Sequence, residues 1–229
     1  MKKIILLVTA FIGMNSLQAQ EITPSIAVVG EGVVRVTPDQ VLIKVRVESE
    51  GSSAQQVKSD NDKAIDKVLK YTKSMGVKEG DVKTEYVNLN KNYDYQTKEY
   101  KYVANQSISI LLKDLNKYSE FTEGLLNAGI NRIDGVTFKS TEIETHNSKA
   151  RMEAIKDAKK KAEEYASALG QSVGKALTIS ETGSISAPQP IYRMEMMKSA
   201  DSSGGGDMET IAVGEMVIEA KVNVTFHLK

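Results

Sequence analysis

Cysteine is absent from the 229 residues of this chain. Its absence excludes disulfide bonds and a lipid-modified cysteine, so packing and hydrogen bonds must hold the fold together. An excess of positive charge is also missing, since 30 basic side chains balance 30 acidic ones. A nucleic-acid-binding protein is expected to carry a basic patch on a clearly basic domain. The charge balance therefore argues against nucleic acid as a partner.

Histidine is scarce as well, because only His146 and His227 occur. A serine hydrolase needs a base, usually histidine, to take the proton of its nucleophile. We expect His146 to lie at the surface just before a helix and His227 on the polar side of the last strand. No Gly-x-Ser-x-Gly elbow occurs, and Gly30-Glu31-Gly32 lacks the third glycine and the following helix of a dinucleotide site. The sequence therefore predicts neither an enzyme nor a cofactor.

Long apolar runs are limited to one stretch, Ile4–Met14. It follows Lys2 and Lys3 and precedes Leu17-Gln18-Ala19, the order of a secretory signal peptide cleaved after a small residue. The run is shorter than the ~20 apolar residues that span a bilayer, although an uncleaved anchor is the alternative. We predict a signal peptide at 1–19, export, and a single domain at 20–229 without a transmembrane segment.

Apolar periodicity in the rest of the chain predicts alternating strands and helices. The predicted strands are 26–36, 41–48, 82–93, 100–112, 133–144, 175–182 and 222–228, and the predicted helices are 54–75, 114–128 and 148–169. Gly30 and Gly32 mark a bulge or a close backbone approach in the first strand. The last helix carries an alanine stripe on its apolar side, which lets a helix lie close to its neighbour.

This order predicts an α+β fold, a mostly antiparallel sheet with helices packed on one face. One arrangement is an extra strand followed by two βαββ units joined by a helix. The other is a ferredoxin-like βαββαβ unit over residues 40–144. Residues 183–210 contain Pro188, Pro190 and the run 202–206 of serine and glycine, which predicts a flexible excursion inside the domain.

Several short motifs recur along the chain in a characteristic order. They are Val29-Gly30-Glu31-Gly32 with Thr37-Pro38-Asp39, Tyr93-Asp94-Tyr95 with Tyr102-Val103-Ala104-Asn105-Gln106, Ala128-Gly129-Ile130 through Gly135-Val136-Thr137-Phe138, Ala150-Arg151 through Ala168-Leu169-Gly170-Gln171-Ser172-Val173-Gly174, and Val213-Gly214-Glu215. In these motifs the chain resembles the SIMPL-domain family, also described as periplasmic immunogenic or outer-membrane antigens. The resemblance implies an exported, envelope-associated and often oligomeric protein. It implies no catalytic residues, because the family has no agreed catalytic motif.

Two groups of side chains suggest metal binding. If the strand reaches residue 144, alternation places Glu142 and Glu144 on one face with His146, two oxygen donors and one nitrogen donor for zinc or another divalent ion. The alternative is a solvated strand end before a helix, where acidic residues suit the helix dipole. The second group consists of thioethers that could hold Cu(I) or consume oxidants. Its members are Met194, Met196, Met197 and Met208.

Tyrosines concentrate at the predicted hairpin. Tyr93, Tyr95, Tyr100 and Tyr102 frame the loop 96–99, and a symmetric turn sets Tyr95 across from Tyr100 and Tyr93 across from Tyr102. The rings could merely stiffen the hairpin, or they could form a recognition patch, since tyrosine suits interfaces that are part apolar and part wet.

The sequence thus favours an exported protein, periplasmic or associated with the outer membrane. It would act by binding or assembly and form homo-oligomers through the tyrosine hairpin and the 183–210 excursion, and an envelope component is a further candidate partner. The competing hypothesis is a protein that protects against oxidative stress through a bound metal or through its methionines.

Overall fold

The computed structural model describes residues 23–181, 189–191 and 213–229. The predicted signal peptide at 1–19 and the methionines of the predicted excursion lie outside these residues, as does most of that excursion. Within the described part of the chain, none of the helices combines the length and apolarity that crossing a bilayer requires.

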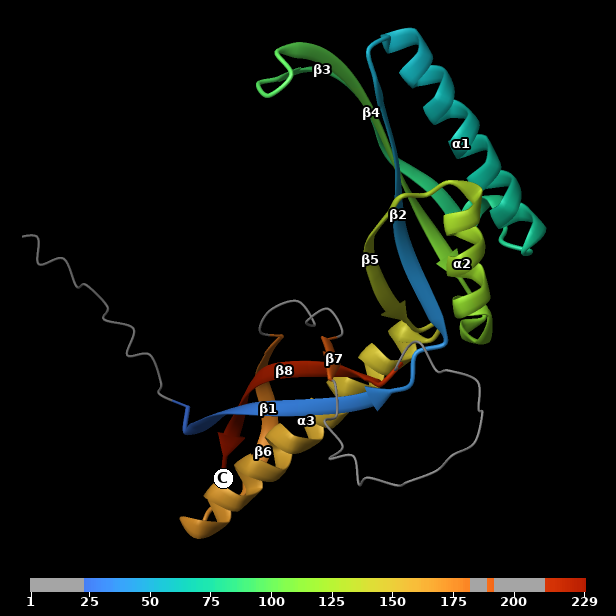
Figure 1. Ribbon diagram of the computed structural model, residues 1–229. Coiled ribbons are helices and arrows are strands. Elements are labelled where there is room, and N and C mark those ends of the chain that lie inside the picture. The colour runs from blue at the N-terminus through green and yellow to red at the C-terminus, as the bar shows by residue number, and fades with distance from the viewer. Residues whose placement is uncertain (1–22, 182–188, 192–212) are drawn as a thin grey trace, which may run out of the picture.

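The first sheet has four antiparallel strands in the order β3-β4-β2-β5. These strands are β2 Gln40–Gly51, β3 Val82–Asp94, β4 Glu99–Leu112 and β5 Arg132–Lys139. Helices α1 Ala54–Ser74 and α2 Tyr118–Ala128 cover one face of the sheet (Figure 1), with single turns η1 Glu79–Asp81 and η2 Leu115–Lys117 before β3 and α2. The alternation predicted for β2 is confirmed, because Val41, Ile43, Val45 and Val47 are buried against the helices.

The α+β class is confirmed, and strand pairing distinguishes between the two predicted arrangements. β5 pairs with β2 over Gln40–Arg46, so residues 40–139 form the ferredoxin-like βαββαβ unit. A second βαββ unit beginning at residue 133 is not formed. β5 belongs to the first sheet because its Val136 and Phe138 pack against the first core. The predicted strand 133–144 is too long, since β5 ends at Lys139 and α3, Ile143–Ala168, begins four residues later.

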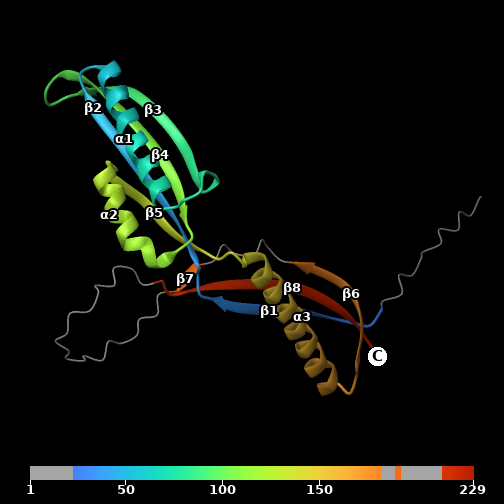
Figure 2. The ribbon, with the colours of Figure 1, turned by 90° about the vertical axis from the view of Figure 1, so that its right-hand side faces the viewer.

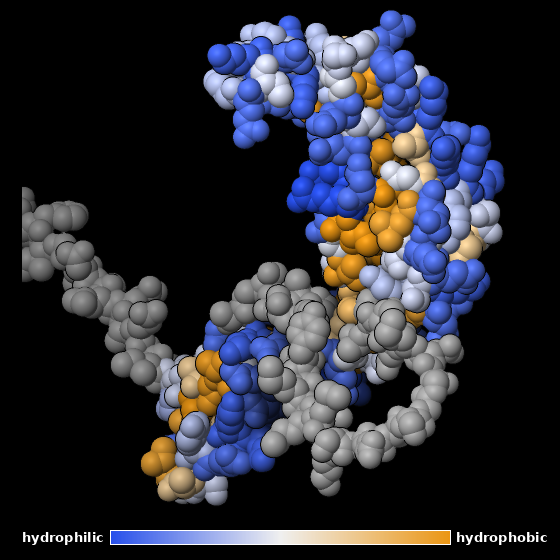
Figure 3. Space-filling model, viewed as in Figure 1, coloured by the Kyte–Doolittle hydropathy of each residue, from blue (hydrophilic) through white to orange (hydrophobic). Residues whose placement is uncertain are grey.

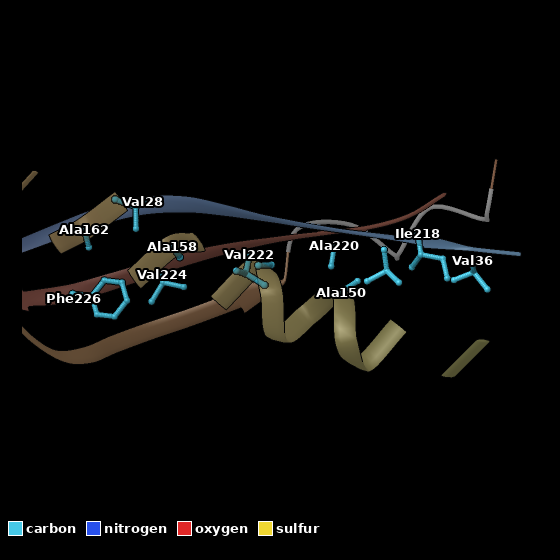
Figure 4. Close-up of a cluster of buried hydrophobic side chains, with 12 residues drawn as sticks. Val28, Val36, Ala150, Ala158, Ala162, Ile218, Ala220, Val222, Val224 and Phe226 are labelled. Carbon is cyan, nitrogen blue, oxygen red and sulfur yellow. The ribbon is translucent and has the colours of Figure 1, made fainter. Parts of the chain in front are cut away.

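The second sheet combines the two ends of the described chain. Its order is β1-β8-β6, with β1 Ser25–Val36, β6 Val173–Glu181 and β8 Glu215–Leu228, and the short strand β7 Gln189–Ile191 pairs with the start of β8. Helix α3 packs on one face of this sheet, so each sheet has its own helical cover and its own core (Figure 2). Figure 4 shows valines of β1 and β8 facing alanines of α3.

The alanine stripe brings α3 unusually close to β1. Its members, all fully or almost fully buried, are Ala150, Ala154, Ala158, Ala162 and Ala166. A Cβ built on Gly30 would lie 2.0 Å from the carbonyl oxygen of Ala154, and one on Gly32 would lie 2.0 Å from that of Ala150. The register between β1 and β8 runs without a shift. The two glycines therefore serve a close backbone approach, one of the two predicted roles, and not a bulge.

Side chains of α3 also reach the free edge of β1. The backbone N–H of Glu31 donates to the Asp157 carboxylate at 2.9 Å, and the Lys161 ammonium donates to the carbonyl of Val29 at 3.0 Å. Lys161 and Asp157 are themselves joined by a 2.7 Å ion pair. The hydrogen bonds to Lys161 and to Glu31 lower the pKa of Asp157, so the carboxylate that caps this strand edge stays ionised.

Candidate functional site: the tyrosine hairpin

The hairpin of β3 and β4 ends in a four-residue turn, residues 95–98, that extends beyond the helices (Figures 1 and 2). Tyr93 lies opposite Tyr100, and Lys91 lies opposite Tyr102. The predicted pairs, Tyr95 with Tyr100 and Tyr93 with Tyr102, are therefore wrong. The loop has the predicted length of four residues but begins one residue earlier.

Asp94 explains this earlier start of the turn. Its Oδ1 accepts hydrogen bonds from the backbone N–H of Gln96 at 2.9 Å and of Thr97 at 3.2 Å, which closes a turn directly after Asp94. Lys98 takes a left-handed conformation with φ 57° and completes the reversal. The pKa of Asp94 is lowered, mainly by the hydrogen bonds from the backbone N–H groups of Thr97 and Gln96 and to a smaller extent by the contact with Lys101. The Lys101 ammonium lies 3.3 Å from the other carboxylate oxygen.

We call Tyr93, Tyr95, Tyr100 and Tyr102 with Lys91 the tyrosine cluster. The rings of Tyr93 and Tyr95 meet edge to face at 5.1 Å, and those of Tyr93 and Tyr100 lie 5.0 Å apart. The Lys91 ammonium lies 4.2 Å from the centre of the Tyr100 ring and 5.9 Å from that of Tyr102, which are cation–π distances. The structure thus brings the four predicted tyrosines into one cluster and adds Lys91, which contacts Tyr100 and Tyr102 and which the sequence pattern does not indicate.

The cluster is open to solvent at its outer end. Tyr95 is 85% exposed, Tyr100 56% and Tyr93 40%, while Tyr102 is half-buried. At this tip Figure 3 shows hydrophilic and neutral colours, in contrast to the apolar colour that gathers lower on the same sheet. The tip therefore offers ring faces, phenol hydroxyls and charges together, which is the chemistry of a binding surface with an apolar centre and a polar rim.

The helix-free face of the first sheet carries a second polar group that sequence reasoning missed. Arg46 lies 2.8 Å from Asp134 and stacks 5.6 Å from the centre of the Tyr86 ring, while Arg132 contacts the other Asp134 oxygen at 2.8 Å. The hydrogen bond with Asp134 raises the pKa of Arg46. Two guanidinium groups share one carboxylate, so the group keeps a net positive charge, and its ion pairs and ring contact link strands β2, β3 and β5 on this face. Its members come from three strands, and only the polar alternation around Arg46 hints at it.

The predicted metal ligands do not lie on an extended strand. Glu142 is the residue before α3, and Glu144 and His146 belong to its first turns, with the His146 N–H bonded to the Glu142 carbonyl. In a helix, residues two apart point to different sides, so alternation no longer places the three side chains together. No group of three potential ligands to a metal ion occurs among residues 23–181, 189–191 and 213–229. This placement matches the alternative interpretation, acidic residues at a helix N-terminus.

A groove lies between α1 and β3, at the end of β3 far from the tyrosine cluster. Its volume is about 460 Å³, and it is lined by Leu69, Lys70, Thr72, Lys73, Val77, Glu79, Val82 and Thr84. Leu69 follows Ile65 at a helical spacing of four, yet it is 40% exposed whereas Ile65 is buried. The reason is that α1 packs mainly over β2 and β4 and leaves the edge strand β3 largely uncovered. We refer to this feature as the α1–β3 groove.

Comparison with known proteins gives a consistent result. The chain matches the family model described as SIMPL, protein of unknown function (DUF541), over residues 26–226. It is 25% identical over 212 residues to the 26 kDa periplasmic immunogenic protein of Brucella melitensis, covering 89% of this chain and 84% of that protein. It is also 25% identical over 236 residues to the uncharacterized protein YggE of Escherichia coli K12, covering 100% and 95%. A human relative, interleukin-1 receptor-associated kinase 1-binding protein 1, is 24% identical over 176 residues, covering 73% and 64%.

Proposed function

The chain belongs to the SIMPL family, and from that premise we propose that it is a periplasmic protein of the cell envelope that acts by binding and self-association rather than by catalysis. The location is supported by the name of its Brucella relatives, periplasmic immunogenic protein, and by the signal-peptide pattern at 1–19. A non-enzymatic role agrees with the dispersed positions of the two histidines, His146 on α3 and His227 on β8.

The observation that carries the proposal is the exposure of the tyrosine cluster. Burial of an exposed aromatic side chain at an interface contributes favourable binding free energy, because apolar surface is removed from water. Tyrosine is also enriched among the residues that dominate binding. Tyr95 makes one edge-to-face contact with Tyr93 and is otherwise open to solvent. A ladder that only stiffened the hairpin would not require a tyrosine at this outermost position, since Tyr95 lies in the turn and has no cross-strand partner.

Sizing of the mature protein tests this function. We expect a complex several times heavier than the 25.1 kDa of the full chain in light scattering coupled to size exclusion, at micromolar concentration. A variant with Tyr93→Ser, Tyr95→Ser and Tyr100→Ser should elute as a monomer. Tyr165→Ser is the matched control, because Tyr165 is 58% exposed on α3, in the other half of the molecule. A monomeric wild type, or a triple variant that still assembles, would contradict self-association through the hairpin.

A further inference from the structure

The α1–β3 groove has an apolar floor and a charged rim. Leu69, Val77 and Val82 supply the apolar atoms, and Lys70 and Lys73 stand on the rim one helical turn apart. Both ammonium groups are mostly exposed, with Lys70 paired to Asp66 at 2.7 Å and Lys73 3.8 Å from Glu79. A volume of about 460 Å³ falls within the range of about 300–1,000 Å³ typical of pockets that hold small organic groups.

The tip of the hairpin has complementary properties. Its turn presents the ring of Tyr95 together with Lys98 and Glu99, and neither of these two charged side chains has an ion-pair partner in the described part of the chain. An aromatic ring fits an apolar floor, and lysines on a rim can approach its faces as Lys91 already approaches Tyr100. The negative charge of Glu99 is complementary to the positive charges of Lys70 and Lys73, and the positive charge of Lys98 is complementary to the negative charge of Glu79.

The tip cannot occupy the groove of its own chain. Thr84 at the groove and Tyr95 at the tip are separated by eleven residues of extended strand, which is about 36 Å at ~3.3 Å per residue. Both features lie along the continuous pairing of β3 with β4, so strand geometry sets the distance between them. Contact between them therefore requires two molecules.

We propose that the hairpin tip of one copy seats in the α1–β3 groove of a second copy. This inference rests on the proposed self-association and names the surface that receives the tyrosine cluster. Two copies can exchange both contacts about a two-fold axis and close as a dimer, whereas a pair joined by a single tip–groove contact keeps one free tip and one free groove. The complex of several chains expected above selects the single-contact arrangement. Successive copies then add head to tail, and the assembly closes into a ring or grows as a filament according to the rotation between neighbours.

Complementation between two disabled variants tests the contact. The groove variant carries Leu69→Glu and Thr84→Glu, both at exposed positions, and the tip variant carries the three tyrosine substitutions described above. Each variant alone should elute as a monomer, and an equimolar mixture should form pairs of two chains that do not grow further. The control variant, Gln55→Glu with Asn88→Glu, adds the same charge to α1 and β3 outside the groove and should assemble like the wild type.

Cross-linking tests the contact directly, through the proximity of two introduced thiols. The chain contains no cysteine, so Tyr95→Cys and Leu69→Cys introduce the sole thiols. We expect oxidation of the Tyr95→Cys and Leu69→Cys mixture to give covalent dimers, the double variant to give a ladder of higher multiples, and either single variant to stay largely uncross-linked. Dimers from Tyr95→Cys alone, with none gained on mixing, would indicate a tip-to-tip contact and overturn the inference.

The two proposals fail in different ways. If the groove variant assembles like the wild type while the tip variant is monomeric, self-association through the tyrosines stands and the groove is not its receptor. If the tip variant itself assembles, the proposed role of the hairpin is wrong and the groove inference falls with it. Circular dichroism of each variant establishes that it is folded, and Leu69→Ser replaces the groove variant if the glutamates unfold it.

Discussion

Replacement of Gly32 by alanine measures how tightly α3 is held against the second sheet. The Cβ of the new side chain would lie 2.0 Å from the Ala150 carbonyl oxygen and 2.5 Å from the Ala154 backbone nitrogen. Real Cβ contacts essentially never fall below 3.0 Å. Both clashing atoms belong to helix backbone and cannot rotate away, so α3 must move outward by about 1 Å to approach normal contact distances.

The cost of this movement can be worked from the packing. A gap of about 0.5–1 Å forfeits roughly a quarter to a half of the dispersion energy of each contact, and the alanine stripe faces the sheet along most of α3. Overpacked cores typically lose about 1–3 kcal/mol, and a backbone clash belongs at the upper end. Alanine also lowers the conformational entropy of the unfolded chain, which offsets about 0.4–1 kcal/mol of this loss of stability. We expect a net loss of about 2 kcal/mol in the free energy of unfolding.

Urea unfolding of the mature protein, followed by circular dichroism, provides the assay. Gly135→Ala in β5 is the matched control, because a Cβ there meets nothing within 4 Å, and its free energy of unfolding should change by less than about 1 kcal/mol. Hydrogen exchange should locate the loss to β1, β8 and α3. If Gly32→Ala unfolds at the same urea concentration as Gly135→Ala, the argument from close approach is refuted.

Three further predictions concern the first sheet. Asn61→Ala removes the amide that donates to the carbonyl of Val47 at 3.0 Å and should lower the free energy of unfolding by about 1–3 kcal/mol in urea titrations. Phe121→Ala should cost about 3–5 kcal/mol in the same assay, because the ring is fully buried, and a loss below about 1 kcal/mol would contradict its core position. The pKa of Asp94 is lowered in the folded state, so its contribution is present above the ordinary pKa of ~3.9 and is lost as the pH falls through the lower folded value. Acid titration by NMR should show the amide of Thr97 losing protection in that range, and unchanged protection in Asp94→Ala would refute the turn assignment.

The sequence alone predicts which side chains are buried wherever the apolar residues of one strand or helix recur at a regular spacing. Alternation in β2 predicts its buried valines and isoleucine, and the spacing of four between alanines predicts the buried side of α3. Gly30 and Gly32 mark a bulge or a close backbone approach in the sequence, and the structure selects the close approach, because no side chain fits between β1 and α3 at that distance.

Features that depend on distant partners could not be predicted in the same way. The partner of β5 is set by the free edge of β2, and periodicity carries no information about which edge a strand joins. The hairpin register depends on hydrogen bonds from two backbone N–H groups to Asp94, which moves the turn by one residue. The α1–β3 groove exists because α1 packs mainly over β2 and β4 and leaves the edge strand β3 largely uncovered, and this lateral offset leaves no trace in the residues that line the groove.

The pairing of β1 with β8 has a consequence for the order of folding. Paired residues of the two strands are at least 180 positions apart along the chain, and the whole ferredoxin-like unit lies between them. During synthesis from the N-terminus, residues 40–139 can collapse early, whereas β1 must wait for the final segment before it gains its central neighbour. Loss of residues 215–229 would remove β8 and leave an intact early-folding half joined to a half that cannot close, a form exposed to proteases and aggregation.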